Sequence, residues 1–153
     1  MSKCIRAALA LAVTAIAATA CSEAPEQEAQ TAPEAPDGIA VTNGRLMLPA
    51  VAGNPGAVYF DVANSGERNM VIRAVDVQGA GSAMMHTGDM EEMSQVMVPP
   101  GETVKFAPGE QHVMAMDLAD TVTAGGQAEV TVTFVGGDKV SIPAEVRAAG
   151  DER

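Results

Sequence analysis

From residue 57 onward, apolar and polar side chains alternate in short runs that end at glycine, proline or asparagine. Alternation with a period of two places successive side chains on opposite faces of a β-strand. The runs cover residues 57–62, 70–77, 96–98, 103–106, 113–118, 128–135 and 139–142. No window of eleven or more residues beyond the first 20 has a helical period. Many short strands separated by turn residues predict an all-β sandwich.

The first 20 residues predict a signal peptide. Lys3 and Arg6 give a positive start, and residues 7–20 form an apolar run that is shorter than the roughly 20 residues a membrane helix needs. Residues 18–20 followed by Cys21 resemble a bacterial lipobox, in which the cysteine becomes lipidated. The alternative is an ordinary Ala-x-Ala cleavage site beside an incidental Cys21. Both interpretations predict export, and the first predicts a periplasmic protein anchored to a bacterial membrane by its lipid.

The part of the chain after the signal peptide divides into a linker and one domain. Residues 21–38 are mostly glutamate, alanine, proline, glutamine and threonine. Such a segment has too little apolar surface to offset its ordering entropy, so we expect a disordered tether. The strand pattern extends the folded part over residues 39–148, which is enough for one hydrophobic core.

The net charge of the chain limits the classes of partner that we expect it to bind. Acidic residues number 20 and basic residues 9, which gives a net charge of −11. Loss of a leader that contains Lys3 and Arg6 makes the net charge −13. We therefore expect no nucleic-acid partner, and no membrane contact except through a lipid anchor.

Sulfur chemistry in the predicted domain comes from methionine alone. Cys4 leaves with the signal peptide and Cys21 lies at the end of the mature chain, so a disulfide framework and a blue-copper centre are both excluded. The segment 84–116 contains both histidines and seven of the ten methionines. Thioether and imidazole ligands without a thiolate favour Cu(I).

Strand alternation assigns candidate ligands. His112, Met114 and Met116 fall on one face of one predicted strand. His86 and Met97 lie in neighbouring segments, so adjacent strands would bring four neutral ligands together: His86, Met97, His112 and Met114. The alternative is that the methionines only fill gaps in the core and the histidines are structural.

The same residues resemble the signature of the PCu(A)C family of periplasmic copper chaperones. That signature has a histidine, ten residues, a methionine, about twenty-one residues and then His-x-Met. His86 is followed by ten residues and Met97, and His112-Val113-Met114 gives the last part. The flanking residues 59–66 and 100–109 are also similar to the family pattern.

One interval differs from the family pattern. Fourteen residues separate Met97 from His112, where the family has about twenty-one. An alignment with its gap placed earlier gives the role of Met97 to Met93, or to Met90. His86, His112 and Met114 keep their roles in either alignment.

The resemblance implies a cupredoxin-like Greek-key β-sandwich that carries Cu(I) and passes it on by ligand exchange. It implies that the acceptor is the CuA-containing subunit of cytochrome c oxidase or another copper chaperone. A structural or interaction lipoprotein without a metal is the alternative. An enzyme is not expected, because Ser82 or Ser94 with His86 and Asp89 lacks the nucleophile elbow and oxyanion motif of a catalytic triad.

Overall fold

The computed structural model describes residues 35–151 of the 153-residue chain. This range contains strands and no helix, which confirms the all-β prediction. The strands are β1 (Ile39–Met47), β2 (Gly56–Asn64), β3 (Met70–Val77), β4 (Ser82–His86), β5 (Glu92–Met93), β6 (Val96–Val98), β7 (Thr103–Phe106), β8 (His112–Met116), β9 (Gln127–Phe134) and β10 (Lys139–Arg147). The predicted signal peptide, Cys21 and residues 21–34 of the predicted linker lie outside the described residues.

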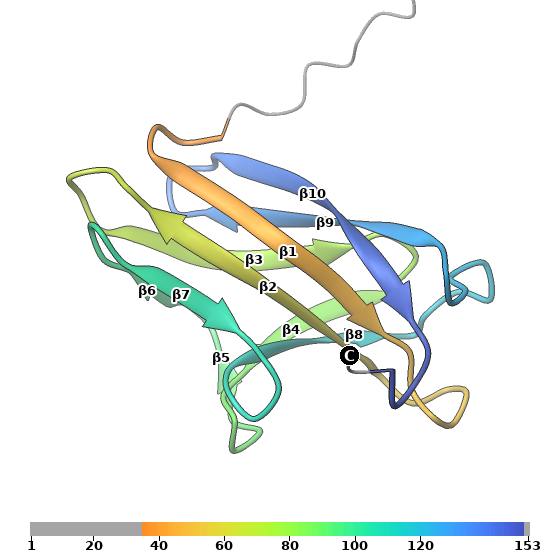
Figure 1. The fold of residues 1–153 in the computed structure, drawn as a ribbon. Coiled ribbons are helices and arrows are strands. Elements are labelled where there is room, and N and C mark those ends of the chain that lie inside the picture. The colour runs from red at the N-terminus through yellow and green to blue at the C-terminus, as the bar shows by residue number, and fades with distance from the viewer. Residues whose placement is uncertain (1–34, 152–153) are drawn as a thin grey trace, which may run out of the picture. The chain divides into compact units, whose positions relative to one another are not determined.

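The strands form one continuous hydrogen-bonded sheet that folds over a core (Figure 1). The strand order is β5-β4-β8-β2-β1-β10-β9-β3-β6, and β7 pairs with β2 beside this path. The pairing of β1 with β10 is parallel, and the other pairings are antiparallel. β8 therefore lies between β4 and β2 and pairs with both.

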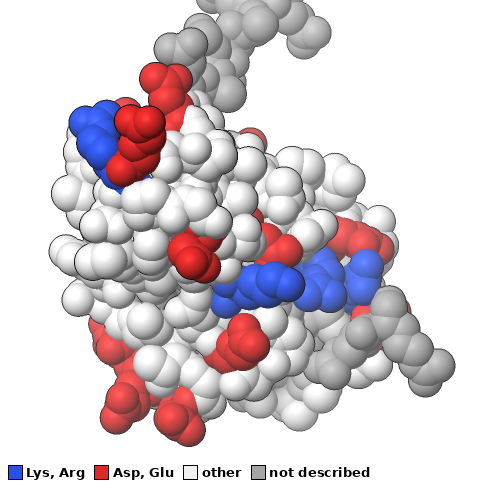
Figure 2. Space-filling model, turned by 60° about the vertical axis from the view of Figure 1, so that its left-hand side comes forward, with Lys and Arg blue, Asp and Glu red and all other residues white. Residues whose placement is uncertain are grey.

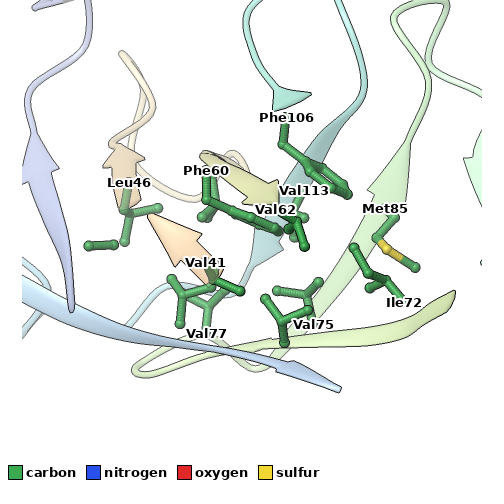
Figure 3. Close-up of a cluster of buried hydrophobic side chains, with 14 of the residues drawn as sticks. Val41, Leu46, Phe60, Val62, Ile72, Val75, Val77, Met85, Phe106 and Val113 are labelled. Carbon is green, nitrogen blue, oxygen red and sulfur yellow. The ribbon is translucent and has the colours of Figure 1, made fainter. Parts of the chain in front are cut away.

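The core consists mainly of valine with three phenylalanines. In β2, Val58, Phe60 and Val62 are buried and alternate with half-buried residues. The rings of Phe60 and Phe106 stack with centroids 4.4 Å apart. Figure 3 shows how side chains of β1 and β2 meet those of β3 across the core. Full burial of each such side chain contributes about 1.5–3 kcal/mol, so this packing fixes which face of every strand points outward.

Asn64 closes the turn that follows β2. Its side chain is 2% exposed. The Nδ2 group donates hydrogen bonds to the carbonyls of Arg68 and Val98, at 2.8 and 2.9 Å, and Oδ1 accepts one from the Gly66 amide at 3.0 Å. The asparagine turn expected from the sequence is therefore present, and it also ties β6 to the end of β2.

Three strands have the bounds that alternation predicted, namely β3, β6 and β7. β1 was not among the predicted runs because its centre contains Asn43-Gly44, which is a turn-forming pair. The structure uses Asn43 at φ 59° inside a register shift between Thr42 and Arg45. The residues that favour a turn form a β-bulge instead, and the strand continues on both sides of it.

Candidate metal centre

The candidate ligands lie on the antiparallel pair formed by β4 and β8. His86 is directly opposite His112, and Met84 is directly opposite Met114. The residues between them, Met85 and Val113, are buried in the core. Because paired residues point to the same side of a sheet, both histidines and both methionines lie on the outer face of this strand pair.

The two imidazole rings are neighbours. Their centroids are 6.1 Å apart, and the ring planes differ by 29°. When two imidazoles bind one metal ion, each nitrogen–metal bond is about 2 Å long. With the radius of each ring added, the two ring centroids then lie about 5–6 Å apart. His86 and His112 are therefore within reach of a common metal ion with little movement.

Backbone contact fixes the tautomer of His112. Its Nδ1 atom lies 3.0 Å from the carbonyl oxygen of Glu110. A carbonyl oxygen only accepts hydrogen bonds, so Nδ1 carries the proton and Nε2 keeps its lone pair when the ring is neutral. Histidines that bind metals are commonly oriented by such a second hydrogen bond. Residue types alone do not predict this contact, because its acceptor belongs to the backbone.

His86 has an unsatisfied ring nitrogen. Its Nδ1 atom is buried and has no hydrogen-bond partner among the described residues. A buried polar atom without a partner costs about 1–3 kcal/mol. A soft metal ion bound at Nδ1 would remove this cost, and a donor set of imidazole nitrogen and thioether sulfur suits Cu(I).

The sequence-predicted methionines occupy different faces and strands. Met114 is half-buried and shares its face with His112. Met97 lies on β6, which pairs with β3, and its side chain is 57% exposed. Met93 pairs with Met85, so it points to the core side of the sheet, where it packs against buried residues. Met97 and Met93 both stay predictions for the fourth ligand.

Two loops meet beside the histidine pair. A Cβ atom on Gly88 would lie 2.5 Å from the carbonyl oxygen of Gly109, so the loop after His86 touches the loop before His112. Glu110 lies next to this contact, and Glu92 pairs with His86. No group of three or more His, Cys, Asp or Glu side chains within residues 35–151 is arranged to hold a metal ion.

The arrangement does not form the catalytic triad considered above. Ser82 and His86 are four residues apart on one strand, which corresponds to about 13 Å at roughly 3.3 Å per residue. The unpartnered Nδ1 of His86 accepts no hydrogen bond from Ser94.

Nothing in the described range forms a helix that could cross a membrane.

Comparison with known protein sequences finds relatives that match most of the chain. A family model described as "Putative lipoprotein LpqE-like" matches residues 39–146. A curated protein of Leifsonia xyli subsp. xyli (strain CTCB07), named "Putative lipoprotein Lxx21020", is 27% identical over 157 residues, which cover 96% of this chain and 93% of that protein.

Solved structures with a similar fold include copper-binding domains. The copper-bound PCuAC domain from PmoF2 superimposes with a TM-score of 0.65 at 27% identity, over 72% of this chain and 93% of that domain. The solution structure of Cu(I)-DR1885 from Deinococcus radiodurans gives a TM-score of 0.64 at 18% identity, over 78% and 85% of the two chains. These likenesses confirm the cupredoxin-like sandwich and the PCu(A)C resemblance, and the match over residues 39–146 shows that the chain belongs to the LpqE-like lipoprotein family.

Proposed function

We propose that this protein is a metallochaperone that carries Cu(I) on the outer face of β4 and β8. His86, His112 and Met114 supply three ligands, and the spacing in the sequence assigns the fourth to Met97, with Met93 as its alternative. The observation that carries the proposal is the separation of 6.1 Å between the two imidazole rings. The domain that binds copper covers residues 39–148, after a signal peptide at 1–20 and a linker at 21–38.

The ligand chemistry suits delivery of the ion. Thioether sulfur and neutral imidazole leave the monovalent charge of Cu(I) uncompensated, so a thiolate-containing acceptor binds the ion more tightly. Copper is therefore the cargo, and it moves by stepwise exchange of ligands. The half-exposed positions of His86, His112 and Met114 allow an acceptor to approach the ion.

The names of the relatives support the proposed location. The family description and the Leifsonia protein name both specify a lipoprotein, which supports lipidation of Cys21 and a periplasmic site of action. The acceptor we propose is a cytochrome c oxidase subunit with a CuA centre, or a second copper chaperone. No enzymatic step is proposed, because ligand exchange breaks no covalent bond of a substrate.

Anaerobic titration of the chain that begins at Ser22, with Cu(I) in the presence of a competing chelator, tests the binding step. The expected result is stoichiometric binding of a single ion, and an affinity that falls by at least about tenfold in His86→Gln or His112→Gln, because an amide replaces an imidazole ligand. Absence of stoichiometric binding by the unmodified chain would instead favour a structural or interaction lipoprotein without a metal.

A transfer experiment tests the acceptor. Cu(I)-loaded protein is mixed with the soluble CuA domain of a cytochrome c oxidase, and the copper content of each protein is measured after separation. Copper is expected on the oxidase domain, because its thiolates bind Cu(I) more strongly. Retention of copper by the donor would exclude this acceptor and leave a second chaperone as the partner.

A further inference from the structure

We propose that Met84 is a copper ligand of this chain and fills the fourth position of the centre, in place of the Met97 or Met93 that the spacing in the sequence favours. The proposal rests on the proposed function, because it concerns the same ion. Met84 lies opposite Met114 in the rung next to the one that joins His86 to His112. Two imidazoles and two thioethers therefore occupy four adjacent positions on one face of one strand pair.

The spacing of these positions suits a single ion. Directly opposite Cβ atoms in an antiparallel pair lie about 5 Å apart, and residues two apart on one strand lie about 7 Å apart. An ion above the centre of that rectangle is within reach of both histidines and both methionines. Methionine has three rotatable side-chain bonds, so each sulfur can swing inward without a change in the backbone.

Burial separates Met84 from the methionine beside it. Met85 is 5% exposed and belongs to the core, whereas Met84 is 38% exposed. Its outward direction is fixed, because a reversal would expose Met85 and break the pairing with β8. The side chain of Met84 is thus held on the outer face next to Met114, although it contributes little to the core.

The other methionines of residues 84–116 are less well placed to share an ion with the two histidines. Met116 is opposite Ser82, two rungs from the histidine pair, or about 13 Å along the strand. Met93 points to the core side. Met97 lies on a strand that pairs with neither β4 nor β8. Among the described methionines other than Met114, Met84 alone lies on the face of the histidines in a pair adjacent to His86 and His112.

A centre built in this way needs no ligand from a loop or a third strand. The backbone hydrogen bonds between β4 and β8 fix the backbone positions of all four residues before the metal arrives, so binding orders only their side chains. Such a site also offers only neutral nitrogen and sulfur donors, which favours Cu(I) over Zn(II) and Mg(II).

The test compares Met84→Leu with the matched variant Met97→Leu. Leucine preserves the volume of methionine and removes the sulfur. The sulfur neighbours counted by X-ray absorption of the Cu(I) form are expected to fall from about two to about one in Met84→Leu and to stay the same in Met97→Leu. The affinity for Cu(I) is expected to fall by about tenfold in the first variant only.

An unchanged sulfur count and affinity in Met84→Leu, with a loss of sulfur in Met97→Leu, would overturn the proposal and leave copper binding intact. A loss of one sulfur in each variant would support Met84 as a ligand in a centre with an additional thioether. Failure of the unmodified chain to bind Cu(I) would reject the proposed function itself, and the role of Met84 with it. Met84→Gln, which also removes the sulfur, repeats the measurement if the leucine variant aggregates.

Discussion

At the scale of single residues, a backbone carbonyl group orients the ring of His112. The carbonyl oxygen of Glu110 accepts a hydrogen bond from the Nδ1–H group of His112, and this leaves the Nε2 lone pair free for a metal. His86 has no such contact, and its buried Nδ1 atom stays unsatisfied. The two histidines of the chain therefore differ: a backbone hydrogen bond orients His112, whereas His86 has a buried ring nitrogen without a hydrogen bond.

Met114 gives the most direct test of a sulfur ligand at this scale. Met114→Leu is expected to lower the affinity for Cu(I) by at least about tenfold, because the thioether is lost. The free energy of unfolding is expected to fall by less than about 1.5 kcal/mol, because leucine has a similar volume. Chelator competition and urea denaturation measure the two quantities. An unchanged copper affinity in a folded variant would remove Met114 from the centre.

Part of the site was predictable from the sequence at this scale. Alternation along residues 112–116 places His112 and Met114 on one face, as the structure has them. Met84 could not be singled out in the same way, because its importance depends on the register between β4 and β8. Register is set by core packing across strands that lie far apart in the sequence, and no local pattern contains it.

At the scale of elements, the loop that follows β4 and the loop that precedes β8 act as one unit. Gly88 lies so close to the carbonyl of Gly109 that only a residue without a Cβ atom fits. The hydrogen bonds that join Thr87 to Glu91 and Ala107 to Gln111 close the two loops. Because His86 and His112 stand at the base of these loops, their separation depends on the contact between Gly88 and Gly109.

Gly88→Ala is expected to weaken Cu(I) binding by about tenfold, because the added methyl group pushes the loops apart and separates the imidazoles. Gly125→Ala is the control. Gly125 has a φ of +83° and open space around its Cβ position, so its substitution costs roughly 1 kcal/mol through backbone strain alone. Copper affinity and thermal unfolding are measured for both. Equal copper affinities in the two variants would show that the loop contact does not position the histidines.

Most strands were predictable because each places apolar side chains on one side only. β1 and β4 were harder. The Asn43-Gly44 pair in β1 has the composition of a hairpin turn, and only its neighbours β2 and β10 make the bulged strand favourable. In β4, the consecutive methionines Met84 and Met85 hide the alternation, since one residue type occupies both faces. In both segments, the local composition does not determine whether a strand forms, and pairing with neighbouring strands does.

At the scale of the whole molecule, negative charge dominates. The chain has a net charge of −11, and Figure 2 shows basic side chains in a stripe across one face with acidic side chains around it. Arg45 and Lys105 line one cavity together with Asp61. A negative field of this kind raises the local concentration of cations, which agrees with the capture of a monovalent metal ion.

The closure of the sheet by its last strand leads to a further prediction. β10 lies between β1 and β9, and it buries Ala144 and Val146. A chain that stops at Gly137 is expected to lose cooperative unfolding, because both halves of the sheet lose a neighbour and part of the core. A chain that stops at Arg147 keeps β10 and is the control. Circular dichroism during heating distinguishes them. A cooperative transition in the shorter chain would show that β10 is dispensable.

Parallel pairing of the first strand with the last also sets the order of events in the cell. A polypeptide that emerges from a ribosome or a translocation channel begins at its N-terminus, so β1 is delivered long before residues 139–147. Until those residues arrive, the edges of β1 and β9 stay open to pairing with other chains. A chain held before residue 139 is therefore expected to aggregate more readily than the complete chain.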